Sequence, residues 1–245
     1  MEWREAWVSE VDSLARNDTW RLEELPPGRK AIGCRWLFKR KEDGRYTARL
    51  VAKGYSQQEG VDFTDTFAPV AKFNSLRTLL ALVCENDWEL KGMDVKTAFL
   101  NSEVAEEVYM DIPEGLEGGH MSSNTQKPIV CRLIKSIYGL KQSPRAWYGR
   151  INSFFVDHRF QRTEQDHNVY IHSVLKMILL LYVDYLLITA PTPPAIDWIR
   201  SLLHHEFEMT DLRPLTVFLG MEIRWNRSHR SLHLSQQQYI QIILE

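Results

Sequence analysis

Two aspartates stand at positions where a charge would need a partner. Asp94 follows Met93 at the end of a predicted strand in "KGMDVKTAF", and Asp184 lies between the apolar runs of "KMILLLYVDYLLITA". Burial of a carboxylate is costly unless a cation or hydrogen bonds neutralise it. Mg²⁺ suits such a pair, because it takes hard oxygen ligands from one or two carboxylates beside substrate phosphates. Two such ions about 4 Å apart can activate a hydroxyl and stabilise a leaving pyrophosphate. For either aspartate alone, the capping of a turn is an open alternative.

A second group of residues that could do chemistry is basic. The stretch "AIGCRWLFKRKEDGRYTARLVAKGY" alternates apolar and basic residues around Asp43 and Gly44, which predicts a hairpin with these two residues in its turn. We expect a positive face that lines a cleft, formed by Arg35, Lys39, Arg40, Lys41 and Arg49. Because side chains alternate along a strand, four of these residues can share one side only if the register holds across the turn. These four are Arg35, Lys39, Lys41 and Arg49. A solvated strand face is the alternative. The basic residues of the stretch are Arg35, Lys39, Arg40, Lys41, Arg45, Arg49 and Lys53.

The composition sets limits on the class of protein. The chain has 245 residues, of which 44% are hydrophobic and 25% charged, as in a globular protein with a substantial core. A formal net charge of −2 means that any nucleic-acid contact must come from local basic clusters. Three cysteines lie far apart without a CxxC spacing, which argues against a structural zinc site and is typical of a reducing compartment. We expect no signal peptide, and the longest apolar run, Met177 to Leu181, is too short to span a bilayer.

The elements that must position these residues follow from periodicity and turn signals. Strands and helices interleave without regular βαβ alternation, so we expect an α+β fold with a largely antiparallel sheet, in which the strand of Asp94 neighbours the 178–188 hairpin. The expected elements are a helix over 3–16, a loop over 17–30, a buried helix over 75–88, a strand, a short helical or turn segment and a strand over 89–110, a loop over 114–128, a turn and then a helix from about Pro144, a hairpin over 176–190, a helix over 191–212 and two strands around 226–229.

Seven stretches carry a resemblance that covers nearly the whole chain in one order. They are "WRLEELPPGRKAIGCRWLFKRK", "RLVAKGYSQQEGVDFTDTFAPVAK", "MDVKTAFLNSEVAEEVYM", "YGLKQSPRAWY", "LYVDYLLIT", "FEMTDLRPLTVFLGMEI" and "LSQQQY". In these stretches the sequence resembles the reverse transcriptase domain of copia-type (Ty1/copia) retrotransposons. The resemblance implies the interleaved fingers and palm of a right-hand polymerase over 1–245, with an antiparallel palm sheet packed on helices. No protease, integrase or RNase H domain is expected in the chain.

The resemblance also implies an activity and its partners. The family reaction copies RNA into DNA by nucleotidyl transfer with two Mg²⁺ ions. The implied partners are an RNA or DNA template with its primer and deoxynucleoside triphosphates, with no membrane. The family implies an intracellular setting, in a cytoplasmic particle or the nucleus, and leaves the oligomeric state open.

Individual residues inherit roles from the matching motifs. Asp94 and Asp184 match metal-binding, catalytic carboxylates. Phe99, five residues after Asp94, matches an aromatic that would exclude a ribose 2′-OH, with a core position as the alternative. In the segment expected over the incoming base pair, Gly139 would allow close backbone approach and Lys141 could face the template or nucleotide. Arg49 and Lys53 are both candidates for the triphosphate, while Trp147 and Tyr148 are expected to belong to a helix core.

Two departures from the family pattern concern activity. The family hairpin reads Tyr-x-Asp-Asp, whereas this chain reads Tyr182-Val183-Asp184-Tyr185. A phenol is neutral near pH 7 and is a poor ligand for hard cations, so we expect catalysis to be impaired. Arg213 replaces a glycine that would suit a tight turn. Three functions therefore stay open: an active polymerase, an inactive remnant that still binds nucleic acid, and a host-recruited interaction module.

Overall fold

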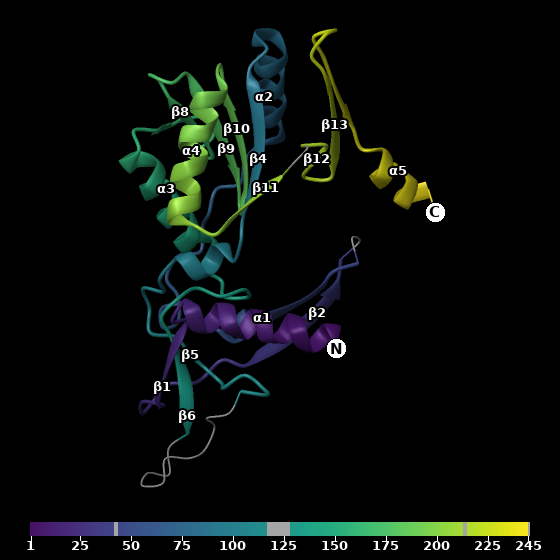
Figure 1. The fold of residues 1–245 in the computed structure, drawn as a ribbon. Coiled ribbons are helices and arrows are strands. Elements are labelled where there is room, and N and C mark those ends of the chain that lie inside the picture. The colour runs from purple at the N-terminus through teal and green to yellow at the C-terminus, as the bar shows by residue number, and fades with distance from the viewer. Residues whose placement is uncertain (42–43, 117–127, 213–214, 245) are drawn as a thin grey trace. The chain divides into compact units, whose positions relative to one another are not determined.

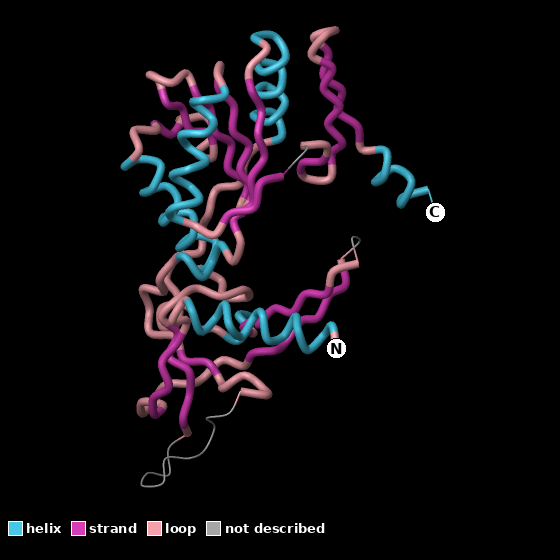
Figure 2. The backbone as a smooth tube through the Cα atoms, in the orientation of Figure 1, coloured by secondary structure: helices cyan, strands magenta, loops and turns pink. Residues whose placement is uncertain are grey.

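The computed structural model describes residues 1–41, 44–116, 128–212 and 215–244. The chain forms two compact units that alternate along the sequence: unit 1 comprises Met1–Ala68 and Thr97–Ile151, and unit 2 comprises Pro69–Lys96 and Asn152–Glu245. Both units mix helices with sheets (Figures 1 and 2), and among the described residues all ladders between strands are antiparallel. The predicted α+β class with antiparallel sheets is confirmed at this level. Asp43, Arg213 and most of the expected 114–128 loop lie outside the described residues.

Unit 1 is built on a hairpin, a small sheet and an N-terminal helix. Helix α1 packs on the hairpin, where the Trp3 ring lies 5.7 Å from the ring of Phe38 and 4.3 Å from that of Tyr46, edge to face in both cases. The sheet has the order β1-β6-β5, and the hairpin pairs β2 with β3. The elements are α1 (Glu2–Arg16), β1 (Trp20–Glu24), β2 (Cys34–Arg40), β3 (Tyr46–Ala52), the 3₁₀ helices η1 (Gly54–Ser56) and η2 (Ala98–Asn101), β5 (Tyr109–Met110) and β6 (Ile129–Leu133). Helix α3 (Ser143–Asp157) begins in unit 1 and ends in unit 2.

Unit 2 contains a six-stranded sheet with the order β11-β4-β10-β9-β8-β7. One face packs on α2 through a core that includes Leu76, Leu80, Leu180 and Leu187, and α4 contacts β10 and β4. A second sheet has the order β12-β13-β14. The elements are α2 (Phe73–Asn86), β4 (Glu89–Val95), β7 (Gln161–Arg162), β8 (Val169–His172), β9 (Met177–Tyr182), β10 (Tyr185–Ala190), α4 (Pro193–Glu206), β11 (Met209–Leu212), β12 (Val217–Phe218), β13 (Met221–Asn226), β14 (Ser231–Ser235) and α5 (Gln237–Leu244).

Several element predictions were wrong for tertiary reasons. Strands β1 and β6 form where we expected loop and turn, because they pair with each other over five residues each. The helix expected to reach residue 212 ends at Glu206, since residues 209–212 pair with β4 as strand β11. Helix α2 is not buried all round, because Leu82 is 39% exposed. No helix among the described residues is both long and apolar enough to cross a bilayer.

Candidate active site

The two aspartates lie on neighbouring segments of unit 2, Asp94 on β4 and Asp184 in the loop between β9 and β10. Strand β4 lies beside β10 in the six-stranded sheet, with Asp94 opposite Tyr185. The Val95 amide donates a hydrogen bond to the carbonyl oxygen of Asp184 over 2.9 Å, so backbone bonding between the two segments continues into the hairpin loop. Both aspartate side chains are half-buried. The predicted neighbourhood of β4 and the hairpin is confirmed.

The hairpin loop is tight and its backbone is strained. Tyr182 pairs with Tyr185, which leaves only Val183 and Asp184 in the loop. Val183 has a φ of +57°, an outlier for a β-branched residue. Such conformations cost of the order of 1–3 kcal/mol and gather at functional sites. The pairing of Tyr182 with Tyr185 holds Val183 in this conformation and places Asp184 directly before strand β10.

Asp94 is flanked on its own face of the sheet by two hydroxyl-bearing residues. Its cross-strand partners are Tyr185 on β10 and Thr210 on β11, and directly opposite residues of antiparallel strands point to the same face. The Tyr185 ring packs edge to face with Phe218 at 6.3 Å between centroids. A phenol therefore stands beside Asp94 where a second hairpin carboxylate would stand. Within the described ranges, no cluster of three or more His, Cys, Asp or Glu residues could hold a metal ion.

In unit 1, a stack of three side chains contains two of the predicted residues. The Arg49 guanidinium lies over the ring of Tyr138, 4.4 Å from its centroid. The Phe99 ring meets the same tyrosine edge to face at 4.8 Å. Phe99 is half-buried, so it is neither a fully buried core residue nor a free surface ring. The sequence analysis missed Tyr138, although it directly precedes the glycine of "YGLKQSPRAW" and that position was the available signal.

The backbone of Gly139 lies very close to the backbone of Ala52, which belongs to the same unit. Its φ is +93°, and a Cβ there would lie 2.1 Å from the carbonyl oxygen of Ala52. A Cβ on Gly54 would in turn lie 2.0 Å from the carbonyl oxygen of Gly139. The Ala52 amide donates to the Tyr138 carbonyl over 2.8 Å. The glycines thus lock the Tyr138 segment onto strand β3 and hold the stack in place.

Lys141 follows the same segment, and its side chain covers an aromatic ring. Its ammonium lies 4.5 Å from the centroid of Phe63, and its amide donates to the Oε1 of Gln57 over 2.9 Å. The buried Gln142 receives a hydrogen bond from Gln57 over 3.0 Å and donates to the Asp62 carbonyl over 2.8 Å. These bonds join the "YSQQEG" and "GLKQSP" motifs, a pairing that the sequence analysis did not predict.

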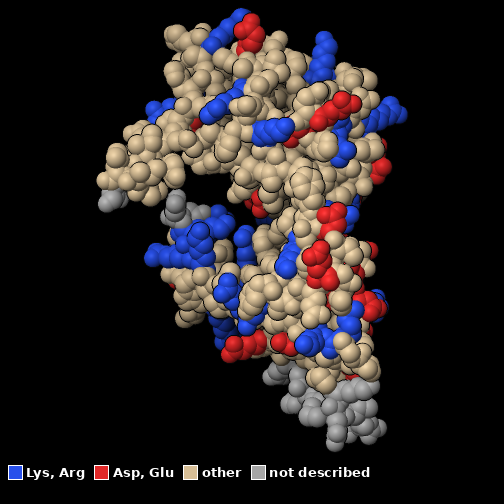
Figure 3. All heavy atoms as spheres, turned by 180° about the vertical axis from the view of Figure 1, so that it is seen from behind, with Lys and Arg blue, Asp and Glu red and all other residues tan. Residues whose placement is uncertain are grey.

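The basic hairpin divides its charges between two faces. Register pairs Arg35 with Val51, Leu37 with Arg49 and Lys39 with Thr47, which places Arg35, Lys39 and Arg49 on one face, as alternation required. Arg40 does not join them, because it stacks on Tyr46 on the other face with 5.6 Å to the ring centroid; the five-residue positive face was wrong in this respect. Figure 3 shows lysine and arginine side chains gathered over the hairpin of β2 and β3.

A carboxylate from α1 lies close to Arg49. One Glu10 oxygen accepts the Leu50 amide over 3.2 Å, which satisfies a backbone donor on the edge of β3. Burial raises the pKa of Glu10, while the bond from Leu50 and the charge of Arg49 act in the opposite direction. Trp147 is 1% exposed, which confirms its predicted place in the core, and Tyr148 is half-buried.

Comparisons with known proteins identify the family of the chain. A family model described as "Reverse transcriptase (RNA-dependent DNA polymerase)" matches residues 17–245. The Retrovirus-related Pol polyprotein from transposon TNT 1-94 of Nicotiana tabacum is 43% identical over 98% of this chain and 18% of its own length. The corresponding polyprotein from transposon RE1 of Arabidopsis thaliana is 38% identical over 97% and 16%. The Ty1-NL2 Gag-Pol polyprotein of Saccharomyces cerevisiae is 26% identical over 91% and 13%.

The chain spans less than a fifth of the length of these relatives. Among solved structures, an apo telomerase from Candida tropicalis truncated from its C-terminal domain has a TM-score of 0.47 at 9% identity, over 95% of this chain and 60% of that one. A likeness at that level carries no argument about function. The family match and the identities suffice: the chain belongs to the reverse transcriptase (RNA-dependent DNA polymerase) family, as a reverse transcriptase domain of the copia-type retrotransposon Pol polyproteins.

Proposed function

We propose that this domain is built to extend a primer on an RNA or DNA template with deoxynucleoside triphosphates, and that Tyr185 impairs this reaction. In this proposal unit 2 is the palm and unit 1 the fingers of a right-hand polymerase, and together they make one catalytic domain. The observation that carries the proposal is the place of Asp94 and the Asp184 hairpin on adjacent strands, with a tyrosine in the third position.

The carboxylates fit a hard divalent cation. Asp94 and Asp184 both offer oxygen ligands from half-buried positions on neighbouring segments, and Mg²⁺ commonly uses one or two protein carboxylates beside phosphate oxygens. When bound, Mg²⁺ would supply the positive charge that favours an ionised 3′-hydroxyl and a leaving pyrophosphate. The two aspartates would hold that charge in position.

Residues of the Tyr138 stack are proposed to bind the nucleotide. Arg49 offers a fixed guanidinium for the triphosphate and is favoured over Lys53, because Arg49 alone lies on the ring that contacts Phe99. Phe99 would exclude a ribose 2′-OH sterically. Gly139 holds the segment through its close approach to β3, and Lys141 is proposed to face the template or nucleotide.

The cost of Tyr185 follows from charge. Two carboxylates instead of three would have to balance the cations and the triphosphate, and the neutral phenol supplies no ligand of comparable strength. Removal of one charge-stabilising group at such a centre lowers the rate by about a hundred- to a thousandfold. Its packing against Phe218 keeps the ring in that position.

Primer extension tests the proposal with a matched pair of variants. The unaltered chain should show little or no Mg²⁺-dependent DNA synthesis, and Tyr185→Asp should raise it by about a hundredfold or more. Tyr185→Asn removes the same ring without adding a charge, so it should stay near the unaltered chain. Asp184→Asn in the Tyr185→Asp background should abolish the gain.

Two outcomes would contradict this assignment. Robust synthesis by the unaltered chain, lost in Asp184→Asn, would show that two carboxylates suffice and that Tyr185 is tolerated. Equal gains in Tyr185→Asp and Tyr185→Asn would show that the bulk of the ring, and not the missing charge, is the defect.

Nucleic-acid binding without catalysis is the second candidate function. The shared face of Arg35, Lys39 and Arg49 favours it, because phosphate contacts need no metal site. Salt-dependent binding of primer–template, together with no DNA synthesis by the Tyr185→Asp variant, would support nucleic-acid binding without catalysis over polymerase activity.

A further inference from the structure

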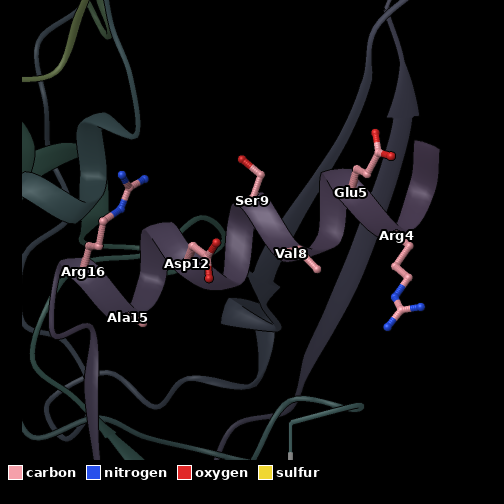
Figure 4. Close-up of a pocket in the computed structure, with 7 residues that line it drawn as sticks. All are labelled: Arg4, Glu5, Val8, Ser9, Asp12, Ala15 and Arg16. Atoms are coloured by element: carbon pink, nitrogen blue, oxygen red, sulfur yellow. The ribbon is translucent and has the colours of Figure 1, made fainter. Parts of the chain in front are cut away.

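Two surfaces of unit 1 differ in what could cover them. The first is a hollow of about 610 Å³ lined by seven residues that all belong to α1 (Figure 4), and all seven are exposed. With no second element among the described residues to form an opposite wall, it is a solvated helix face. The second is the outer edge of strand β1, which stands at the end of the sheet order β1-β6-β5.

The backbone of β1 presents hydrogen-bonding groups along its outer edge. On the inner side, the Thr19 carbonyl accepts the Ile134 amide over 2.8 Å, which continues the register of β1 with β6. In an antiparallel ladder, successive residues alternate between facing the partner strand and facing away from it. Odd-numbered residues therefore face β6, and Trp20 and Leu22 direct their amides and carbonyls outward. Among the described residues, the backbone groups of Trp20 and Leu22 find no hydrogen-bond partner on that side.

Arg21 is a cation at this edge without a compensating carboxylate. It is exposed and lies directly opposite Arg132 in the ladder, and like charges in that position destabilise a sheet. Arg132 pairs with Glu23 at 3.9 Å and with Glu107 at 3.5 Å. Arg21 makes no ion pair within the described ranges. A carboxylate on the outer side of β1 would therefore stabilise Arg21.

Leu22 lies on the other face of the same strand. It is 49% exposed, although its cross-strand neighbour Cys131 is fully buried. The difference arises because β1 ends the sheet, and among the described residues no further strand lies beside Leu22. An apolar side chain directly opposite Leu22 would remove its surface from water.

The sequence of β1 is self-complementary when two copies run antiparallel. Arg21 and Glu23 flank Leu22 at equal distances and share one face of the strand. If the two Leu22 residues lie opposite each other, Arg21 of each copy lies opposite Glu23 of the other. A shift by two residues would place Arg21 opposite Arg21, or Glu23 opposite Glu23. A shift by one would set outward backbone groups against inward ones. Charge and hydrogen bonding therefore select a single register.

We propose that β1 binds β1 of a second copy of this chain as an antiparallel pair centred on Leu22, which joins the two three-stranded sheets into one. Charged edge strands resist pairing with strands that lack matching charges. A second copy supplies the match twice, because two-fold symmetry repeats each pair. Five residues per copy make a small contact compared with a standard interface, so the dissociation constant should be about 10–100 μM. This dimer lies beyond the proposed function, since it needs neither metal nor nucleic acid.

Sedimentation equilibrium of the full chain, without metal or nucleic acid, tests the dimer at concentrations that bracket about 50 μM. Arg21→Glu should weaken association by about tenfold or more, because it replaces two attractions by two repulsions. Lys30→Glu makes the same change of charge at an exposed position outside β1, so it should leave association unchanged. Leu22→Pro removes an outward amide without removing a bond to β6, and it should abolish the dimer.

A mixture of two variants tests the register. Arg21→Glu and Glu23→Arg should each associate weakly alone, because each places like charges opposite each other. In the mixture, an acidic strand meets a basic one, so association should return to the strength of the unaltered chain. Hydrogen–deuterium exchange gives a readout that needs no variant: the segment 19–25 of the unaltered chain should exchange more slowly as the concentration rises.

The outcomes decide the proposal without reference to primer extension. Unchanged association in both Arg21→Glu and Leu22→Pro would overturn it, as would a monomer at every concentration. Loss of the dimer in the single variants without recovery in the mixture would overturn the register. Circular dichroism identifies any variant that does not fold, and in that case the exchange of segment 19–25 decides: exchange that does not depend on concentration would overturn the dimer.

Discussion

At the residue scale, Tyr138 contacts two predicted residues that are far apart in sequence. Arg49 comes from β3 and Phe99 from η2, and each contacts the tyrosine ring from its own side. A guanidinium over a ring gains about 0.5–2 kcal/mol, which restricts the motion of both partners. The proposed nucleotide contacts are therefore oriented before any nucleotide binds.

Phe99 gives a prediction at this scale. In the Tyr185→Asp background, Phe99→Val should raise the ratio of ribonucleotide to deoxyribonucleotide incorporation by about tenfold or more, because a smaller side chain no longer excludes the 2′-OH. Phe99→Tyr keeps the ring and should keep the selectivity. Single-nucleotide incorporation with paired ribo- and deoxyribonucleotides measures the ratio. If Phe99→Val leaves the ratio of ribonucleotide to deoxyribonucleotide incorporation unchanged, Phe99 has a structural role only.

Glu10 gives a second prediction, on stability. Because burial raises its pKa in the folded chain, the stabilising contribution is present below the unfolded value of about 4.3 and is lost as the pH rises through the folded value. Glu10→Gln keeps an oxygen for the Leu50 amide without the charge. It should raise the melting temperature at pH 7, with a smaller gain near pH 4.

The control for Glu10 lies on the same helix. Glu5 is exposed on α1, so Glu5→Gln should leave the melting temperature unchanged at both pH values. Thermal unfolding followed by circular dichroism measures both variants. A lower melting temperature for Glu10→Gln at pH 7 would show that the ionised carboxylate stabilises the fold.

At the element scale, α2 is capped by a residue that is remote in sequence. Its N-cap residue, Lys72, makes no side-chain cap. Instead, the Asp166 carboxylate accepts the Lys72 amide over 2.9 Å and the Ser75 hydroxyl over 2.6 Å. The same carboxylate accepts the Asn168 amide over 3.0 Å. One buried aspartate thus joins the start of α2 to the loop before β8.

Acid unfolding tests this cap. Burial acts to raise the pKa of Asp166, but the bonds from Ser75, Lys72 and Asn168 outweigh it and the pKa is lowered. Its stabilising contribution is therefore present above the unfolded value of about 3.9 and is lost as the pH falls through the folded value. Asp166→Asn should cost about 1 kcal/mol of unfolding free energy at pH 7, and less near pH 2.

Glu164 provides the control for this cap, because it is exposed in the same loop. Glu164→Gln should leave the urea midpoint unchanged at both pH values. A loss in Asp166→Asn that is as large at pH 2 as at pH 7 would show that shape, and not charge, makes the cap.

At the scale of the whole molecule, the two units alternate along one chain. The chain passes between them at Ala68–Pro69, Lys96–Thr97 and Ile151–Asn152, so neither unit is a single excisable segment. Asp94 lies two residues before the end of unit 2's first stretch, and Phe99 lies two residues after the start of unit 1's second stretch. The last crossing lies inside α3, whose continuous backbone belongs to both units.

Salt dependence is the prediction for the whole molecule. If Arg35, Lys39 and Arg49 each neutralise one phosphate, the logarithm of duplex affinity should fall with the logarithm of salt with a slope of about −2.7. The triple change to glutamine should remove most of that slope. Arg224, which pairs with Glu222 in unit 2, supplies the control as Arg224→Gln. Affinity that does not change between about 50 and 200 mM salt would rule out backbone contacts.

The sequence by itself determined the local elements and the family. Periodicity and turn residues were enough for α1, the two hairpins and the start of α4, because their signals lie within one segment. The long ordered motifs fixed the family and pointed to Asp94 and Asp184. The departure at Tyr185 is also a fact of sequence alone.

Only the tertiary structure decided which segments pair and which side chains meet. Strands β1, β6 and β11 are short and carry weak local signals, so their partners across the sheet stabilise them as strands. The Tyr138 stack and the Asp166 cap join residues from segments far apart in sequence, and no local pattern encodes such contacts. Burial and register, which depend on the whole chain, placed Tyr185 beside Asp94 and separated Arg40 from the other basic residues.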